Sequence, residues 1–281
     1  MAVRAANSSA LAWPPFGHGH VHAHDRHDEA FVKVCRYVRL KAAGRPGLSQ
    51  VYGEGHMDEI SRDIRFVPDA GFEEVSAILD RSDACRSLLV LGHGSGSNMR
   101  VPFIEGLSSA LVDSGVATFR YQYPYSESID FVPYSDMEMD APEVLVATVR
   151  SAVAAAAASA PDLPLFAGGH SMGGLMASVA DAASPLDDIT GLVILGFPLK
   201  GDLGQASHLK NVAHPMLFLQ GTADDLGGVD EITEMVTEIK GDISLHFVES
   251  ASHGFSAPGR SDQDVYAEMA TTIAAWTAGL I

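Results

Sequence analysis

The sequence predicts an α/β fold in which a mainly parallel central sheet carries helices on both faces. Short apolar runs alternate with longer helical patterns from Met57 onward, which is typical of parallel strands joined by helical connections. The chain has 281 residues, 47% of them hydrophobic and 19% charged, so it has enough apolar material for a core. Because no internal repeat or linker follows residue 57, we expect residues 57–281 to form one domain.

Seven apolar runs are the expected strands. They cover residues 74–80, 87–93, 116–123, 163–170, 189–197, 215–221 and 243–250. Helical patterns follow several of these runs, near residues 101–114, 137–160, 172–184, 228–240 and 263–279. The pattern near 137–160 contains SAVAAAAASA, where the high helix propensity of alanine predicts a helix.

Residues 1–56 differ in composition from the rest of the chain. They carry 7 basic and 4 acidic side chains, whereas residues 57–281 carry 11 basic and 32 acidic ones. Alternating histidines in an extended chain would place imidazoles on one side, an arrangement suited to metal capture. We interpret the segment instead as a disordered leader outside the fold. Its alternating histidines are His18, His20, His22, His24 and His27.

Charge and cysteine content exclude several functional classes. The net charge is −18, and such an acidic surface repels phosphate backbones, so we expect no nucleic-acid partner. Cys35 and Cys85 cannot form a disulfide framework and have no metal-ligand spacing around them, which favours a reducing compartment. The sequence has neither an apolar run of membrane-spanning length nor a secretory signal, so we expect a cytoplasmic protein without a membrane partner.

A candidate nucleophile lies between the strand at 163–170 and the helix at 172–184. Residues 169–173 read G-H-S-M-G, a G-x-S-x-G pattern in the strand-to-helix context that a nucleophile elbow requires. Glycines allow the sharp turn, and the turn holds Ser171 exposed at the N-terminus of a helix. A serine hydroxyl needs a base, so a histidine and an acid are expected downstream.

Asp224 and His253 are the expected acid and base. Each follows a successive predicted strand, which gives the chain order serine, acid, histidine. Asp225 is the adjacent alternative for the acid, and Asp202 follows the preceding strand. For the base, the other histidines lie in the leader, before the domain, within a strand, in other motifs or in the loop before the acid strand. Apart from the five alternating histidines, they are His56, His93, His170, His208, His214 and His246.

A glycine-rich turn after the strand at 87–93 is the candidate oxyanion hole. The segment G-H-G-S-G-S-N at 92–98 allows backbone amides to point into a site, and acyl transfer needs two such donors. We assign these donors to the amides of Ser95 and Met172. The alternative is a phosphate-binding loop, but neither G-x-G-x-x-G nor G-K-[ST] occurs here.

These motifs resemble the α/β-hydrolase superfamily. HGSGSNM, RYQYPY, GGHSMGG, LGFPLKG, LQGTADDLG and SHGF occur in its order over about residues 57–281. More closely, the chain resembles a small cap-less branch whose eukaryotic relatives include a subunit of the NSL chromatin-modifying complex and a testis-expressed protein. The resemblance implies an α/β-hydrolase fold with Ser171, Asp224 and His253 at the triad positions. The branch is also similar to dienelactone hydrolases, which have a cysteine where this chain has Ser171.

The expected activity is hydrolysis of small carboxylic esters, preferably with short acyl chains, through an acyl-enzyme and without a metal or organic cofactor. Only residues 198–214 separate the strands between which a cap would be inserted, so we expect an open site. The aromatic loop after the strand at 116–123 is its expected wall. Alternatively, half of these rings pack beneath the loop. Tyr123, Tyr125 and Phe131 are the candidate substrate-binding residues, with Tyr121 and Tyr134 beside them.

Two other functional classes remain open on the sequence. One is a non-catalytic interaction module, since relatives in the branch are subunits of complexes; the other is metal binding by the leader. Within the fold, peptidase or carbon–carbon hydrolase activity is also open, because the elbow determines the chemistry and not the substrate. The sequence does not indicate the oligomeric state.

Overall fold

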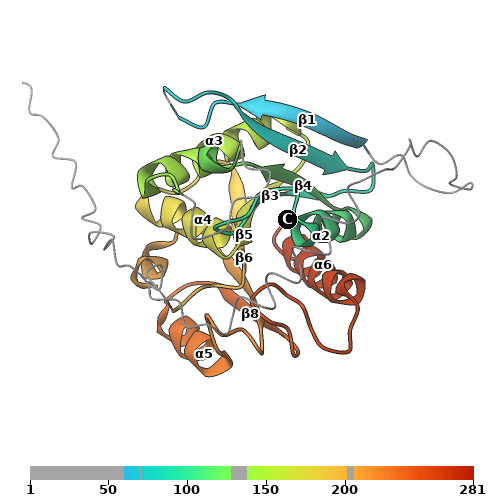
Figure 1. Cartoon of the computed structure of the whole chain (residues 1–281), viewed down its shortest axis with the longest axis vertical. Helices are drawn as coiled ribbons and strands as arrows, with labels where there is room; N and C mark the ends of the chain where they lie inside the picture. The colour runs from blue at the N-terminus through green and yellow to red at the C-terminus, as the bar shows by residue number, and fades with distance from the viewer. Residues whose placement is uncertain (1–59, 70, 128–137, 201–205) are drawn as a thin grey trace, which may run out of the picture. The chain divides into compact units, whose positions relative to one another are not determined.

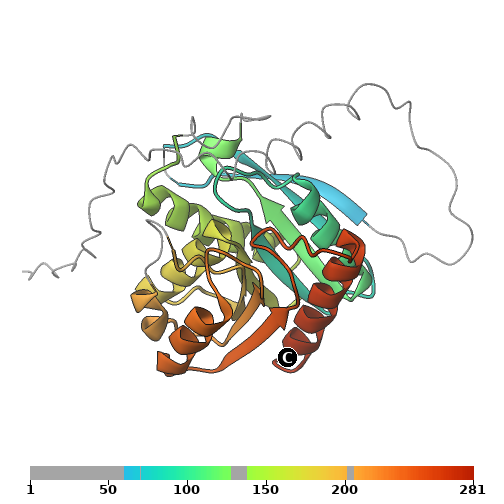
Figure 2. The ribbon, with the colours of Figure 1, turned by 60° about the horizontal axis from the view of Figure 1, so that its bottom comes forward.

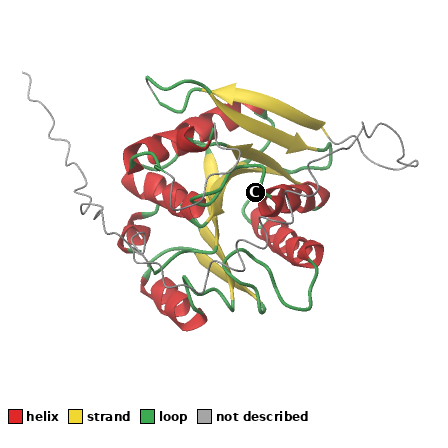
Figure 3. Ribbon diagram, in the orientation of Figure 1, coloured by secondary structure: helices red, strands yellow, loops and turns green. Residues whose placement is uncertain are grey.

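A computed structural model describes residues 60–69, 71–127, 138–200 and 206–281. Their centre is an 8-stranded sheet in the order β1-β2-β4-β3-β5-β6-β7-β8, with helices on both faces (Figures 1 and 3). Strand β2 pairs antiparallel with β1 and with β4, and every other neighbouring pair is parallel. The predicted α/β fold with a mainly parallel sheet is therefore confirmed.

The seven predicted strands are all present, and each begins and ends within two residues of its expected bounds. Such runs can be predicted because strands buried on both faces are almost continuously apolar. The strands are β1 Ile60–Phe66, β2 Val75–Arg81, β3 Ser87–Gly92, β4 Val116–Tyr121, β5 Leu165–His170, β6 Ile189–Leu195, β7 Met216–Gly221 and β8 Ile243–Val248.

Strand β1 is the element that the sequence analysis missed. Its sequence, ISRDIRF, is mostly exposed and contains Arg62, Asp63 and Arg65, so no apolar run marks it. It forms a ladder with β2 from Ile60 opposite Arg81 to Phe66 opposite Val75. The strand is therefore specified by pairing with β2 and not by a hydrophobic pattern of its own.

The predicted helices are also present. The helix expected from residue 137 begins at Pro142, because proline disfavours helical geometry in the residue before it and is well suited to the first helical position. The helices are α2 Pro102–Asp113, α3 Pro142–Ser159, α4 Met172–Ala183, α5 Val229–Glu238 and α6 Asp262–Ala278, with short 3-10 helices η1 Pro124–Ser126 and η3 Ser207–Asn211.

The sheet divides the apolar core into two halves. Side chains alternate along a strand, so Leu88 and Val90 of β3 belong to one half while Leu89 and Leu91 belong to the other. The first half is covered by α3, α4 and α5, and the second by α2 and α6. Figure 2 shows α6, in red, beside α2 on their shared face.

The described residues form no obvious cap domain, in keeping with the predicted cap-less fold. The connection from β6 to β7 is short, and among its described residues the only helix is η3. At the opposite end of the sheet, helix α6 finishes beside the start of β3, where Ser87 Oγ lies 3.4 Å from Thr277 Oγ1. None of the helices in the described ranges is long and apolar enough to cross a membrane.

Candidate active site

Ser171 lies at a sharp turn between β5 and α4. Its φ is 51° and its ψ is −115°, in the left-handed half of backbone space that few residues other than glycine adopt. The turn is packed tightly against β3, since a Cβ on Gly169 or Gly173 would come within 2.3 or 2.4 Å of the Gly92 oxygen. The elbow context predicted for the G-x-S-x-G pattern is therefore present.

Hydrogen bonds connect Ser171, His253 and Asp224. The Ser171 hydroxyl donates to His253 Nε2 at 2.9 Å, and His253 Nδ1 donates to Asp224 Oδ2 at 2.9 Å. The serine and the aspartate are buried, while the histidine side chain keeps 20% of its exposure. The order of these contacts is the one that a nucleophile, a base and an orienting acid require.

The structure distinguishes the two neighbouring aspartates. Asp224 is 4% exposed and faces His253, whereas Asp225 is exposed. Asp224 also accepts hydrogen bonds from Gln220 Nε2 at 2.7 Å and from the Leu226 amide at 2.9 Å. The third candidate acid, Asp202, lies outside the described residues.

Gln220 is a site residue that sequence reasoning missed. It is fully buried at the end of β7, and its Oε1 accepts from the Phe197 amide at 2.8 Å while its Nε2 also reaches the Gly227 carbonyl at 3.0 Å. The Gln220 side chain therefore connects Asp224 to the loops that contain Phe197 and Gly227. The signal was a single amide side chain at the end of the apolar run MLFLQ.

His170, the variable residue of the elbow, contacts the loop of the candidate base. Its Nε2 donates to the His253 carbonyl at 2.9 Å, and the two imidazole centroids lie 5.1 Å apart. Burial, with a contribution from His253, lowers the pKa of His170 to about 4, so its ring stays neutral near neutral pH. Phe103 packs on its other side at 5.0 Å.

The remaining candidate bases are occupied elsewhere. His208 bonds Ser178, His214 bonds the buried Asp181, and His246 bonds Glu268. His56 lies outside the described residues. The histidine in contact with Ser171 is therefore His253.

The glycine-rich turn 92–98 lies beside Ser171. A Cβ on Gly94 would be 3.6 Å from Ser171 Cβ and 3.1 Å from His170 Nδ1. His93 is fully buried, and its Nδ1 donates to the Gly94 carbonyl at 2.8 Å. Burial lowers the pKa of His93 to about 4. Gly94, the residue before Ser95, therefore lies next to the elbow, and Met172 is the first residue of α4. The role of the Ser95 and Met172 amides as oxyanion donors stays a prediction.

The placement of the aromatic loop corrects one expectation. Tyr123 is fully buried, with its ring 5.1 Å from that of His93 and its hydroxyl 3.1 Å from the Tyr121 hydroxyl. It packs beneath the site, with Tyr121, instead of lining it. The Tyr125 ring is half-buried and stacks against Tyr123 at 6.1 Å. Phe131 and Tyr134 lie outside the described residues.

No group of three or more histidine, cysteine or acidic side chains with metal-binding geometry occurs in the described ranges. The alternating histidines at 18–27 lie outside these ranges. A surface hollow of about 530 Å³ lies between α2 and α6 and contains no residue of the Ser171, His253 and Asp224 chain. Within the described ranges, the candidate site is the hydrogen-bonded chain of Ser171, His253 and Asp224.

A family profile described as an alpha/beta hydrolase domain matches residues 85–279. Among solved structures, a dienelactone hydrolase from Anabaena variabilis superposes with a TM-score of 0.65 at 22% identity, covering 79% of this chain and 99% of that one. A lid-less serine hydrolase from Xanthomonas campestris gives 0.59 at 16% identity, covering 81% and 98%. A cold-adapted esterase from an Arctic intertidal metagenomic library gives 0.57 at 19% identity, covering 79% and 96%. At these identities the likeness shows the fold.

Proposed function

This chain belongs to the alpha/beta hydrolase family, and from that premise we propose that it is a serine hydrolase that cleaves small carboxylic esters through an acyl-enzyme. The observation that carries the proposal is the hydrogen-bonded chain from Ser171 through His253 to Asp224. A serine in this setting has a base within proton-transfer distance and an acid that holds that base in the required tautomer. The esterase among the structural neighbours supports the same chemistry.

In the acylation step, Ser171 Oγ attacks the ester carbonyl carbon while its proton passes to His253 Nε2. Asp224 stabilises the imidazolium that forms. The tetrahedral intermediate then breaks its bond to the alcohol oxygen, and His253 returns the proton to that leaving alcohol. The acyl group stays on Ser171.

Deacylation repeats these steps with water. His253 takes a proton from the water, the resulting hydroxide attacks the acyl carbon, and the bond to Ser171 Oγ breaks as the proton returns to the serine. In both steps the negative oxygen is held by the amides of Ser95 and Met172. The amide of Met172 is at the N-terminus of α4, where the helix dipole favours negative charge.

The connection from β6 to β7, where a cap would be inserted, is short. It can therefore enclose little of a long acyl chain, which favours small esters with short acyl groups. Tyr125 and Phe131 are the proposed substrate contacts of the aromatic loop. The dienelactone hydrolase likeness does not carry over its substrate, since in this chain the elbow residue is Ser171 and not a cysteine. No metal or organic cofactor is required.

The test is hydrolysis of p-nitrophenyl esters of increasing acyl length, with labelling by a fluorophosphonate probe. We expect turnover to be greatest for short acyl chains and the label to be attached to Ser171. The matched control is Ser171→Ala, which should lower kcat on the order of 10³-fold or more because no other group replaces the nucleophile. A wild-type protein that neither hydrolyses esters nor takes up the probe would favour a non-catalytic interaction module.

A further inference from the structure

The residue after the glycine-rich turn, Met99, is held by side chains of the segment 120–127, which comprises the end of β4 and the residues that follow it. The Met99 amide donates to Gln122 Oε1 at 2.9 Å, and the Met99 carbonyl accepts from Arg120 Nη1 at 3.0 Å. Met99 is 1% exposed, so both bonds are shielded from water. Both backbone groups of this residue are therefore tied to one neighbouring segment.

The same segment holds the near end of the turn. Ser126 Oγ lies 3.0 Å from His93 Nε2, and His93 Nδ1 donates to the Gly94 carbonyl. Gln122 connects the two ends, because its Nε2 donates to the Ser126 carbonyl at 3.2 Å while its Oε1 accepts from Met99. Ser95 lies between the two anchored ends.

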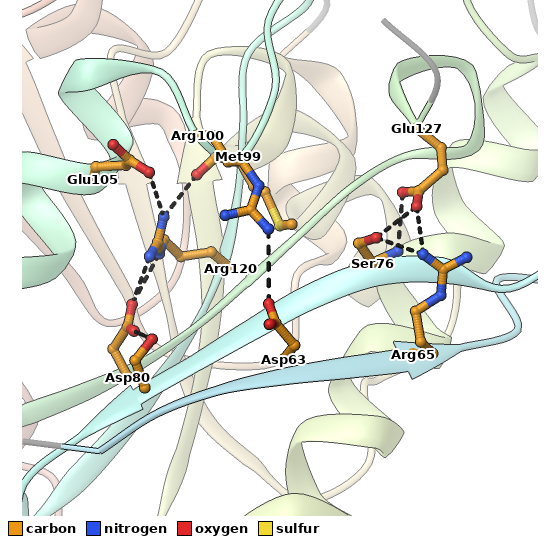
Figure 4. Close-up of polar contacts among 10 residues, drawn as sticks. Asp63, Arg65, Ser76, Asp80, Met99, Arg100, Glu105, Arg120 and Glu127 are labelled. Carbon is orange, nitrogen blue, oxygen red and sulfur yellow. Dashed lines mark hydrogen bonds and ion pairs between the residues drawn. The ribbon is translucent and has the colours of Figure 1, made fainter. Parts of the chain in front are cut away.

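Arg120 is itself fixed within the core. Its Nε and Nη2 both lie 2.9 Å from Asp80 Oδ2, and that carboxylate also accepts from Ser108 Oγ at 2.9 Å. Figure 4 shows the guanidinium directed at Asp80 on one side and at Met99 and Glu105 on the other. With its charge paired, Arg120 presents its remaining donor to Met99 from a rigid position.

Hydrogen bonds of Glu127 join the end of the same segment to the β1–β2 hairpin. Glu127 follows Ser126 directly, and its carboxylate accepts from the Ser76 amide at 2.9 Å and from Arg65 Nη1 at 2.8 Å (Figure 4). The hairpin formed by β2 and the unpredicted strand β1 therefore supports the segment on which the turn rests.

We infer that Arg120, Gln122 and Ser126 are positioning residues that hold His93 and Met99, at the two ends of the glycine-rich turn, so that the Ser95 amide meets the oxyanion, an inference that rests on the proposed function. An oxyanion donor acts only when it is already in place as charge develops, and a displacement of about 0.5 Å weakens it. Ser95 is flanked by Gly94 and Gly96, which have no side chains to hold it in place. The three side chains provide it from outside.

The decisive variant is Gln122→Met, which keeps the length of the side chain and removes its bonds to Met99 and Ser126. We expect kcat to fall by about 10-fold to 100-fold, part of the loss that follows removal of an oxyanion donor, with KM within about threefold. The rates are measured per active site, counted by fluorescent fluorophosphonate labelling run to completion. The Ki of a trifluoromethyl ketone, whose adduct with serine carries a negative oxygen, should rise in parallel.

Gln122→Glu tests rescue, because a carboxylate keeps the acceptor for the Met99 amide and loses only the donor to Ser126. We expect its kcat to lie between those of the wild type and Gln122→Met. The control is Ser87→Ala, which removes a buried bond to Thr277 at the opposite end of the sheet from the turn. It should lower Tm and leave kcat per active site within about twofold of wild type.

The outcomes separate the inference from the proposed function. If the wild type does not react with the fluorophosphonate probe, the proposed function fails and the inference fails with it. If the wild type is active and Gln122→Met keeps its kcat per active site and its trifluoromethyl ketone affinity, only the inference is overturned. Where Gln122→Met does not fold, Ser126→Ala decides by the same two measurements, with a smaller expected loss.

Discussion

At the residue scale, the backbone of Ser171 concentrates strain at the point of chemistry. A left-handed φ of 51° on a residue other than glycine costs on the order of 1–3 kcal/mol and persists only where the surroundings impose it. Here the close approach of Gly169 and Gly173 to the Gly92 carbonyl imposes it. The hydroxyl is thereby held toward His253 before any substrate arrives.

The pair Asp224 and Asp225 gives a matched test of the acid. Asp224→Asn should lower kcat on the order of 10²-fold or more, yet less than Ser171→Ala does, because the amide no longer stabilises the imidazolium. Asp225→Asn, at an exposed position, should stay within about twofold of wild type. Steady-state kinetics on a short p-nitrophenyl ester measure kcat for both variants and the wild type. A larger loss for Asp225→Asn would assign the acid to that residue.

The burial of His93 predicts how the free energy of unfolding depends on pH. Burial lowers its pKa to about 4 in the folded protein, against 6.5 for the unperturbed side chain, so between these values the unfolded chain binds the extra proton. Stability therefore rises with pH across this window and is lost as pH falls through it. His93→Gln should flatten the slope by about 1.4 kcal/mol per pH unit.

Urea unfolding at several pH values between 4 and 6.5 measures this slope. His170 has a pKa lowered in the same direction, so the wild-type slope includes both residues. The difference between wild type and variant isolates the contribution of His93. Equal slopes for the two proteins would show that His93 is not held neutral.

At the element scale, the sequence predicted those parts of the fold that rest on local pattern. Buried strands such as β3 and β7 are continuous apolar runs, and α3 contains an alanine-rich stretch. Strand β1 could not be found this way, since its exposed and charged sequence becomes a strand only through its ladder with β2. Pairing across the chain leaves no periodic signal in one sequence.

The candidate site likewise contains residues that local sequence pattern indicates and residues that it does not. Ser171, Asp224 and His253 each follow a predictable strand, so their order alone indicated a common site, which the structure then brings together. Gln220 bonds Asp224 and His170 bonds the His253 carbonyl. These contacts depend on how the loops fold, and no motif around either residue predicts them. The burial of Tyr123 likewise depends on how the loop packs over His93.

The tight packing of the elbow between β5 and α4 predicts that a side chain at Gly169 is not tolerated. Gly169→Ala should abolish ester hydrolysis and lower Tm, because its Cβ would meet the Gly92 oxygen at 2.3 Å and its φ is 156°. Gly241→Ala is the control, since the nearest atom there is an Ile239 methyl carbon at 3.9 Å. Calorimetry and kinetics on both proteins make the comparison. Full activity of Gly169→Ala would mean that the elbow has room to relax.

At the scale of the whole molecule, the site residues come from one part of the chain. Ser171, Asp224, His253 and the glycine-rich turn all follow residue 91, and the described sheet is built from Ile60 onward. A protein that begins at Met57 should therefore fold and hydrolyse esters as the full chain does, with Tm within about 5 °C, equivalent to about 2 kcal/mol for this size. Parallel thermal unfolding and ester assays test this.

A larger drop in Tm would show that residues 1–56 contribute to the fold. The segment FVKVCRYVRL at 31–40 is the apolar stretch to examine in that case, by deleting residues 1–30 alone. Zinc titration of the full and shortened proteins by calorimetry separately tests metal binding by the five alternating histidines at 18–27. Equal zinc uptake by both proteins would exclude the histidine segment as a metal site.

The end of α6 beside the start of β3 has a practical consequence for handling the protein. Arg86 and Ile281 border the same hollow at the amino ends of β3 and β4, whereas Ser171 follows the carboxyl end of β5. A bead, electrode or carrier surface coupled through this region would hold the sheet with its reactive end turned toward the solution. Under the proposed function, protein immobilised there would keep the Ser171 end open to an ester in solution, and protein attached near Asp225 would not.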